Sequence, residues 1–232
     1  MANYFEDPTT IRLNDTDWQV LATEDYWKGP PEIPTFHGQA PLLSERCIEI
    51  ALAFRWIDLM NNDIVEVGAV TPYHNIPKTL SHPIIDPYDE EATIQDFVEN
   101  QDLTMDNVLS ISTIEHIGMA GGDYDGSGLR QEVADPHASP AALQKILNES
   151  EKCLVTFPVG YNKSLDDWVE NNLDRLQCFG YHKVFGKYVY VGHETHWKTV
   201  WNYYPHVESI KPYQYREPFP LGNFILCITG WK

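Results

Sequence analysis

Short apolar runs that end in acidic or small residues mark the middle of the chain. They lie at residues 63–68, 84–86, 93–96, 107–112 and 153–157, and the third is the weakest. Continuous apolar runs of this length are typical of strands in a parallel sheet that is covered on both faces. The pattern therefore predicts strands at these positions, with helices packed on either side of the sheet.

Helical patterns precede and separate these runs. The chain predicts helices over residues 44–60, 139–149 and 164–176, each beginning at a serine. A serine hydroxyl accepts from free N–H groups of a first helical turn, so Ser44, Ser139 and Ser164 are the expected N-caps. Two later apolar runs, 187–191 and 224–229, are expected to form an antiparallel edge. This alternation indicates an α/β fold, a three-layer sandwich around a sheet.

The beginning of the chain has a different character. Residues 1–43 are polar, aromatic and proline-rich, so they are expected to form an irregular N-terminal arm. Residues 44–232 are expected to form a single domain. Prolines interrupt the connection between the first two apolar runs, and its crossover is therefore expected to be short or irregular.

Composition and charge narrow the classes of function. The 232 residues carry a formal net charge of −18, which repels phosphate backbones and disfavours nucleic acid as a partner. The chain has no apolar run long enough for a membrane span and its N-terminus does not resemble a signal peptide, so a cytoplasmic location is expected. The four cysteines are scattered, which predicts reduced thiols and no zinc site, and no other metal site is predicted.

The ends of the predicted strands supply the candidate ligand site. Ligands of open α/β sheets bind outside the carboxyl ends of the strands, near the point where the strand order reverses. Gly68 permits close backbone approach, and Glu66 beneath it is suited to order the amino end of a ligand. Asp86 stands where ribose hydroxyls are usually bound, Asp96 is suited to an adenine amino group, and Ser112 ends the fourth run. Taken singly, each acid also fits a loop carboxylate or a helix cap.

Phosphate-bearing cofactors are disfavoured. The dinucleotide pattern G-x-G-x-x-G is absent, because Gly68 is the only glycine of its loop, and the pattern G-x-x-x-x-G-K-[ST] is absent as well. These absences argue against NAD and ATP. A nucleoside cofactor without phosphates is the class of cofactor that these absences leave.

Several segments together resemble one family. They are EVGAVTPY at 66–73, IDPYD at 85–89, SISTIEHIG at 110–118, FPVGYN at 157–162 and ERCIE at 45–49. This set resembles class I S-adenosylmethionine-dependent methyltransferases, and most of all a subgroup associated with polysaccharide and glycan biosynthesis. The resemblance covers roughly residues 44–176.

The resemblance implies a Rossmann-like, mostly parallel sheet of the usual seven strands with an antiparallel final strand. It implies S-adenosylmethionine as cofactor, bound at Glu66, Gly68, Asp86 and Asp96, and methyl transfer to a sugar (glycan) hydroxyl, with a functional link to glycosyltransferases. The chain departs from the family in its first loop, which has a single glycine where a glycine-rich loop is commoner. Another small-molecule acceptor, or a non-catalytic module that partners a glycosyltransferase, stays open.

Methyl transfer to a hydroxyl is helped by a positioned base, because a hydroxyl is a weak nucleophile. His116 is the candidate base, since an ordinary histidine pKa of about 6.5 lies near working pH. Glu115 is expected to bind acceptor hydroxyls or to face the cofactor. Asp123, in the acidic glycine-rich loop 121–128, is suited to bind sugar hydroxyls, act as base or hold a divalent ion. A structural histidine and a solvated loop are the alternatives.

Overall fold

A computed structural model describes residues 45–73, 82–104, 106–119, 134–184, 187–193 and 224–231. The expected N-terminal arm, the expected cap Ser44 and the loop that carries Asp123 lie outside these residues.

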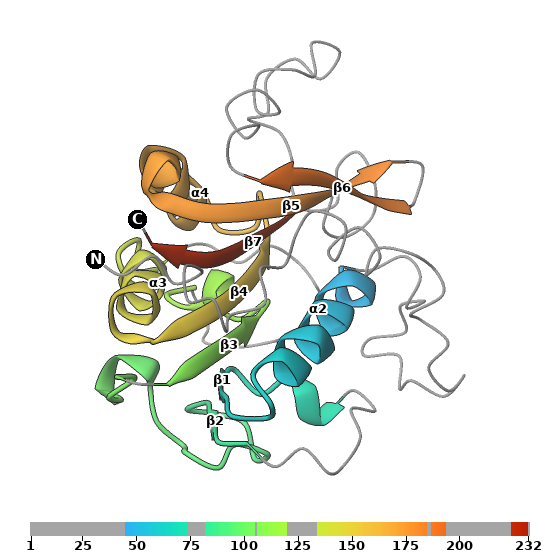
Figure 1. The fold of residues 1–232 in the computed structure, drawn as a ribbon. Coiled ribbons are helices and arrows are strands. Elements are labelled where there is room, and N and C mark those ends of the chain that lie inside the picture. The colour runs from blue at the N-terminus through green and yellow to red at the C-terminus, as the bar shows by residue number, and fades with distance from the viewer. Residues whose placement is uncertain are drawn as a thin grey trace.

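The described part of the chain forms a mixed sheet with the strand order β2-β1-β3-β4-β7-β5-β6 (Figure 1). The strands are β1 Val65–Val67, β2 Ile84–Ile85, β3 Asn107–Ile111, β4 Lys152–Pro158, β5 Leu176–Val184, β6 Lys187–His193 and β7 Phe224–Trp231. Strands β2, β1, β3 and β4 pair in parallel, and β7 runs antiparallel between β4 and β5. The predicted α/β class is therefore confirmed.

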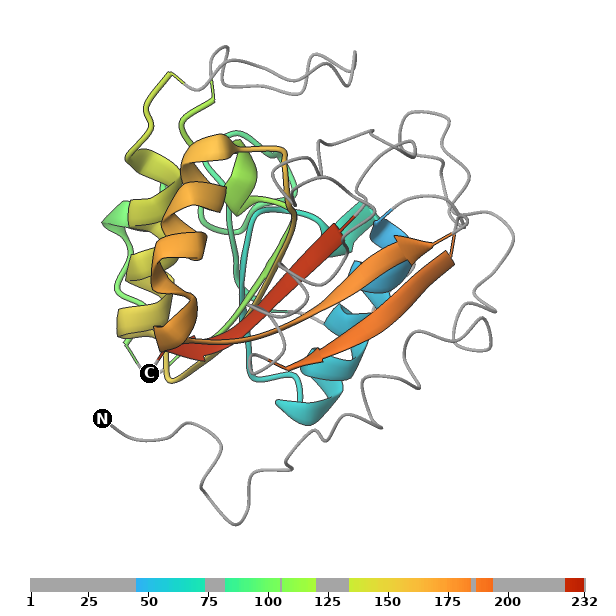
Figure 2. The ribbon, with the colours of Figure 1, turned by 90° about the horizontal axis from the view of Figure 1, so that it is seen from above.

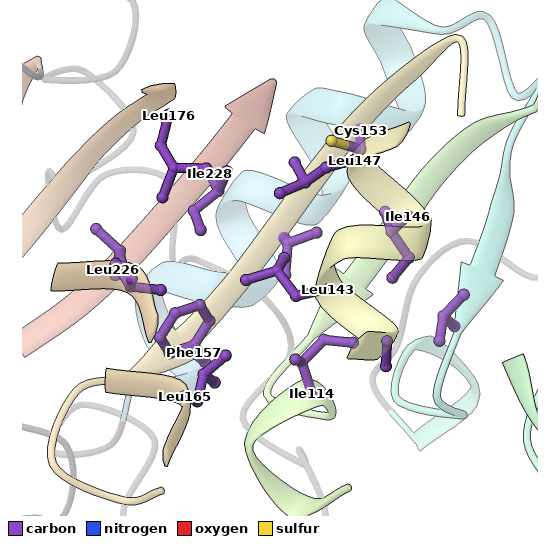
Figure 3. Packing of buried hydrophobic residues seen from close by; sticks show 14 of the residues in the cluster. Ile114, Leu143, Ile146, Leu147, Cys153, Phe157, Leu165, Leu176, Leu226 and Ile228 are labelled. Carbon is purple, nitrogen blue, oxygen red and sulfur yellow. The ribbon is translucent and has the colours of Figure 1, made fainter. Parts of the chain in front are cut away.

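Helices cover both faces of this sheet. Helices α3 (Ala138–Glu149) and α4 (Lys163–Asn172) lie on one face, and α2 (Arg46–Leu59) lies on the other (Figure 2). Leu143 and Ile146 of α3 belong with Phe157 of β4 to one buried cluster on this face (Figure 3). A second cluster joins Leu52 and Trp56 of α2 to the opposite face. Within the described ranges, no helix is long and apolar enough to cross a membrane.

Two predictions about the strands need correction. The weak run at 93–96 makes only an isolated parallel bridge, between Ile94 and Ile85. The two late strands do not pair with each other as an edge, because β6 pairs with β5 while β7 lies inside the sheet. The alternate residues of β7 are apolar on both faces, so the strand is buried inside the sheet. Leu226 and Ile228 belong to one cluster, and Ile225 and Cys227 to the other.

The third predicted helix is also too long. α4 ends at Asn172, a 3₁₀ turn spans Leu173–Arg175, and β5 begins at Leu176. The segment becomes a strand because Leu176 packs into one cluster and Phe179 into the other. A segment that contributes to the core on both faces of a sheet must itself be part of that sheet.

Two of the predicted serine caps, Ser139 and Ser164, do not cap their helices. Ser139 lies inside α3, and its hydroxyl donates to the Ile114 carbonyl at 2.7 Å. Asn162 caps α4, because its Oδ1 accepts from the backbone N–H groups of Ser164 (3.0 Å) and Leu165 (3.2 Å). The Asn162 backbone is extended, as an N-cap requires, whereas Ser164 is already helical.

Replacing Asn162 with alanine is expected to lower the free energy of unfolding by about 2 kcal/mol, about 1 for the cap and about 1 for a buried hydrogen bond. That bond runs from Asn162 Nδ2 to the Glu115 carbonyl at 3.0 Å. Urea unfolding measures the change. Asn171→Ala is the control, because its amide is exposed and bonds the Asp167 carbonyl. A loss as small as that of the control would show that the cap contributes nothing.

Candidate functional site

A cavity of about 490 Å³ lies where β1, β2 and β3 end. Its lining includes Gly68 after β1, Asp86 after β2, and Ser112 and His116 after β3. Because β1 lies between its two neighbours, the residues after β2 and those after β3 flank the β1 loop. The cavity is thus at the position that the parallel strand pattern predicts for a ligand.

Glu66 shapes the loop after β1 from beneath. Its carboxylate is fully buried and accepts from the backbone N–H groups of Val70 (3.0 Å) and Thr71 (2.8 Å), and from the Thr71 hydroxyl. The Nε2 atom of His82 lies 2.8 Å from Oε2, the oxygen that also accepts from the Thr71 hydroxyl. Glu66 is not among the residues that line the described cavity. The structure therefore gives this predicted ligand contact a role within the loop.

Gly68 meets a strict steric requirement. Its φ is +88°, and a Cβ at this position would lie 1.9 Å from the Thr113 hydroxyl oxygen. Only glycine avoids both the strained backbone and the collision. The close approach that the sequence predicts at Gly68 is therefore made to Thr113, while the residue also lines the cavity.

Asp86 joins the two loops that end β1 and β2. Its Oδ2 accepts from the Ala69 N–H at 3.2 Å, and its Oδ1 accepts from the N–H groups of Tyr88 (2.9 Å) and Asp89 (3.0 Å). A carboxylate offers about four acceptor positions, so Asp86 has capacity for a ligand hydroxyl beyond these three bonds. Its place in the lining agrees with the predicted contact to ribose.

Two exposed aromatic rings stand beside Asp86. Tyr88 is 68% exposed and Phe97 is 49% exposed, both line the cavity, and their ring centroids lie 5.9 Å apart at 90°. Large exposed aromatic rings at a cavity mark a surface that a ligand is able to cover. Sequence reasoning missed both residues, although each directly follows the acid or proline of a strand end.

Asp96 supports one of these rings and does not line the cavity. Its carboxylate accepts from the Phe97 N–H (2.7 Å), from Asn100 Nδ2 (2.7 Å) and from Gln101 Nε2 (2.8 Å). These bonds, with that of Asn100 the largest cause, lower the pKa of Asp96. The predicted adenine contact of Asp96 is thus replaced by a turn that presents Phe97.

A fully buried glutamate, Glu49, holds the end of β3. Its Oε1 accepts from the hydroxyls of Ser112 (2.7 Å) and Thr156 (3.0 Å), and its Oε2 accepts from Arg46 (3.1 Å). Ser112 has a φ of +39°, a backbone conformation that needs support from its surroundings. Burial raises the pKa of Glu49, against the opposing effect of Arg46. The only sequence signal for this network was the resemblance of residues 45–49.

His116 and Glu115 share the 3₁₀ turn Ile114–His116, but only His116 lines the described cavity. Burial and the nearby Arg46 lower the pKa of His116 to about 4, which leaves the imidazole neutral at pH 7. A neutral imidazole has a nitrogen that accepts a proton. The ring also packs against Tyr161, with centroids 4.7 Å apart.

Glu115 points into the protein. Its side chain is 1% exposed, its Oε1 lies 3.8 Å from His116 Nε2, and within the described structure its buried Oε2 has no hydrogen-bond partner. Burial first, and then repulsion by Glu49, raise the pKa of Glu115 well above its usual range. The prediction that Glu115 contacts a ligand directly is therefore not supported by its position behind the cavity wall.

The described residues contain no group of three or more His, Cys, Asp or Glu side chains arranged to hold a metal ion. Comparison of the chain with family models, with curated protein sequences and with solved structures gives no match.

Glu115→Gln is expected to change how stability depends on pH. A carboxyl with a raised pKa binds more protons in the folded state, so its stabilising effect is complete below the unfolded pKa and is lost as pH rises through the folded pKa. The carboxamide of glutamine does not titrate, so this loss is absent in the variant. The variant should therefore gain stability relative to the parent as pH increases, by up to about 1.4 kcal/mol per pH unit within the titration range.

Urea unfolding between about pH 5.5 and 8.5 measures this difference. Glu151→Gln, at an exposed glutamate, is the control and should follow the parent at every pH. Parallel stability curves for the parent and Glu115→Gln would contradict the assignment.

Proposed function

We propose that the chain is an S-adenosylmethionine-dependent methyltransferase that transfers a methyl group to a sugar (glycan) hydroxyl. The observation that carries the proposal is the cavity itself, with Asp86 and two aromatic rings after β2 and a neutral histidine after β3. One side suits a nucleoside. The other presents an unprotonated imidazole, and the lowered pKa makes it a weaker base than an ordinary histidine.

The arrangement of the strands supports a Rossmann-like assignment. Strands β2, β1, β3 and β4 are parallel, and the final strand β7 is antiparallel, as the family resemblance implies. The isolated parallel bridge of Ile94 extends the pairing beyond β2. A seven-stranded methyltransferase sheet is therefore part of this proposal.

The cavity fits a nucleoside cofactor. Its volume of about 490 Å³ lies within the range of small-molecule sites. We assign the ribose hydroxyls to Asp86, and the adenine ring to the exposed faces of Tyr88 and Phe97, which offer apolar contact area.

Asp89 accepts from the Tyr73 hydroxyl (2.8 and 2.9 Å), and partial burial together with this carboxylate raises the pKa of Tyr73 to about 12. The Tyr73 hydroxyl therefore stays protonated at neutral pH, and Tyr73 contributes to the cavity lining.

When bound, S-adenosylmethionine supplies a methyl group whose bond to sulfur breaks as its bond to the acceptor oxygen forms, which leaves S-adenosylhomocysteine. The proton of the acceptor hydroxyl passes to the neutral imidazole of His116. The imidazolium that results lies 3.8 Å from Glu115 Oε1, and its positive charge would favour the ionised form of a carboxyl that burial otherwise keeps protonated. Glu115 is thus proposed as a positioning residue and His116 as the catalytic base.

A cytoplasmic location is part of the proposal on the strength of the sequence pattern alone. The sugar acceptor and a link to glycosyltransferases belong to it as well. Their support is the resemblance of SISTIEHIG at 110–118 to the glycan-associated subgroup, since this segment supplies Ser112 and His116 to the cavity. Asp123 is retained as a candidate acceptor contact on the strength of the sequence.

Calorimetric titration tests the cofactor. The parent protein is expected to bind S-adenosylmethionine and S-adenosylhomocysteine saturably, and Asp86→Ala to bind both at least about tenfold more weakly, because a hydrogen-bonded carboxylate is lost. Glu90→Ala is the matched control, since Glu90 is an exposed acid of the same loop that does not line the cavity. A folded parent protein that binds neither compound would remove the methyltransferase proposal.

His116→Gln tests the base. On any sugar that the parent methylates, kcat is expected to fall at least about 100-fold, while the affinity for S-adenosylhomocysteine stays within about twofold. The exposed His137 provides the control variant His137→Gln. Unchanged turnover in His116→Gln would exclude His116 as base, and cofactor binding without turnover on any acceptor in the parent would favour the non-catalytic module.

A further inference from the structure

Arg46 is the only lysine or arginine among the residues that line the described cavity. The other charged residues of the lining are the acids Asp86, Asp89 and Glu99. The chain as a whole has a net charge of −18, so a cation at this place is unlike its surroundings. A guanidinium in a cavity is suited to bind a planar anionic group with two parallel hydrogen bonds.

The ion pair with Glu49 fixes the position of Arg46. Its guanidinium donates to Glu49 Oε2 at 3.1 Å, and the side chain is 21% exposed. Glu49 is fully buried and is itself held by Ser112 after β3 and by Thr156 of β4. A side chain that is already ordered loses less conformational entropy when it binds a ligand. The network therefore places a preorganised cation on the β3 side of the cavity, near His116.

The backbone of the β1 loop offers little to an anion. The N–H of Gly68 donates to the Ile85 carbonyl (2.9 Å), and that of Ala69 to Asp86 (3.2 Å). The N–H groups of Val70 and Thr71 both donate to Glu66, at 3.0 and 2.8 Å. In sheets of this type the first loop commonly binds the anionic part of a ligand through such groups. In this chain the N–H groups of the β1 loop already donate to acceptors within the protein, so an anionic group of a ligand needs a side-chain donor.

The charge near Arg46 is compatible with an anion. Burial raises the pKa of both Glu49 and Glu115, and burial also keeps His116 neutral. The Glu115 shift reduces the negative charge on the β3 side of the cavity, and the charge of Glu49 is paired with Arg46 itself. An incoming anion therefore meets less repulsion there than the number of acids suggests.

We propose that Arg46 forms a carboxylate-binding subsite of the cavity, on the side opposite the nucleoside contacts. This inference rests on the proposed function and extends it, because it assigns the group that holds the end of the ligand far from the adenine. The carboxylate has two sources, the α-carboxylate of the cofactor and a carboxylate on an acidic sugar acceptor. The closed β1 loop favours the first.

Calorimetry with two nucleosides separates the carboxylate from the rest of the cofactor. Decarboxylated S-adenosylmethionine keeps the nucleoside, the sulfonium and the amine, and lacks only the carboxylate. The parent protein should bind S-adenosylmethionine at least about tenfold more tightly than the decarboxylated compound. Arg46→Met should remove this difference by weakening S-adenosylmethionine alone. Arg46→Lys, which keeps a charge without the planar fork, should retain part of it.

Two controls distinguish a loss of folding from a loss of carboxylate binding. Arg55→Met alters the other arginine of α2, which pairs with the exposed Asp58 at 3.6 Å and does not line the cavity, so it should bind both nucleosides as the parent does. Retained binding of decarboxylated S-adenosylmethionine shows that Arg46→Met is folded at the site. If that variant binds neither nucleoside, Arg46→Lys carries the comparison, and equal losses for both nucleosides in Arg46→Lys would overturn the proposal.

The second source is tested in the presence of S-adenosylhomocysteine. If the acceptor supplies the carboxylate, the parent complex should bind methyl β-glucuronide more tightly than methyl β-glucoside, and Arg46→Met should lose that preference while binding S-adenosylmethionine normally. If Arg46→Met changes neither preference, the subsite is refuted while the cofactor assignment stands. A parent protein that binds neither nucleoside refutes the proposed function, and this inference with it.

Discussion

The buried carboxylate of Glu66 organises the part of the molecule on which the cavity depends. A carboxylate that is removed from water must be hydrogen-bonded, and Glu66 meets that need with Val70, Thr71 and His82. These bonds fold the loop after β1 back under its own strand. The loop then lies between the β2 and β3 sides with the N–H groups of Val70 and Thr71 bonded within the protein, and the cavity lining includes the charged side chains of Asp86 and Arg46.

The sequence predicted the strands better than it predicted their pairing. The run at 153–157 is apolar except for Thr156 and became the buried part of β4, because a strand covered on both faces has no side exposed to solvent. The order of the strands depends on contacts between distant residues, which no local pattern contains. This is why β7 was expected at an edge, and why Leu176–Val184 was not recognised as a strand.

For the site, the sequence identified the strand ends that line the cavity but not which of their acids face it. Gly68, Asp86, Ser112 and His116 line the cavity as expected, because they follow strand ends. Glu66, Asp96 and Glu115 have the same sequence signature, yet the first two accept from their own loops and Glu115 points inward. A carboxylate serves a backbone N–H as readily as a ligand, and only the folded loop decides between them. Arg46 and Glu49 lie far from the strand ends in sequence, so strand-end reasoning did not find them.

The interior position of β7 has a consequence for biosynthesis. Strand β7 separates β4 from β5, although it is the last of the described strands to leave the ribosome. Until residues 224–231 have been made, β4 and β5 each keep one edge without the neighbour that the finished sheet provides. Exposed strand edges pair readily with other chains. The nascent protein therefore passes through a stage with two open edges at the centre of its sheet, at which cellular chaperones would be of most use.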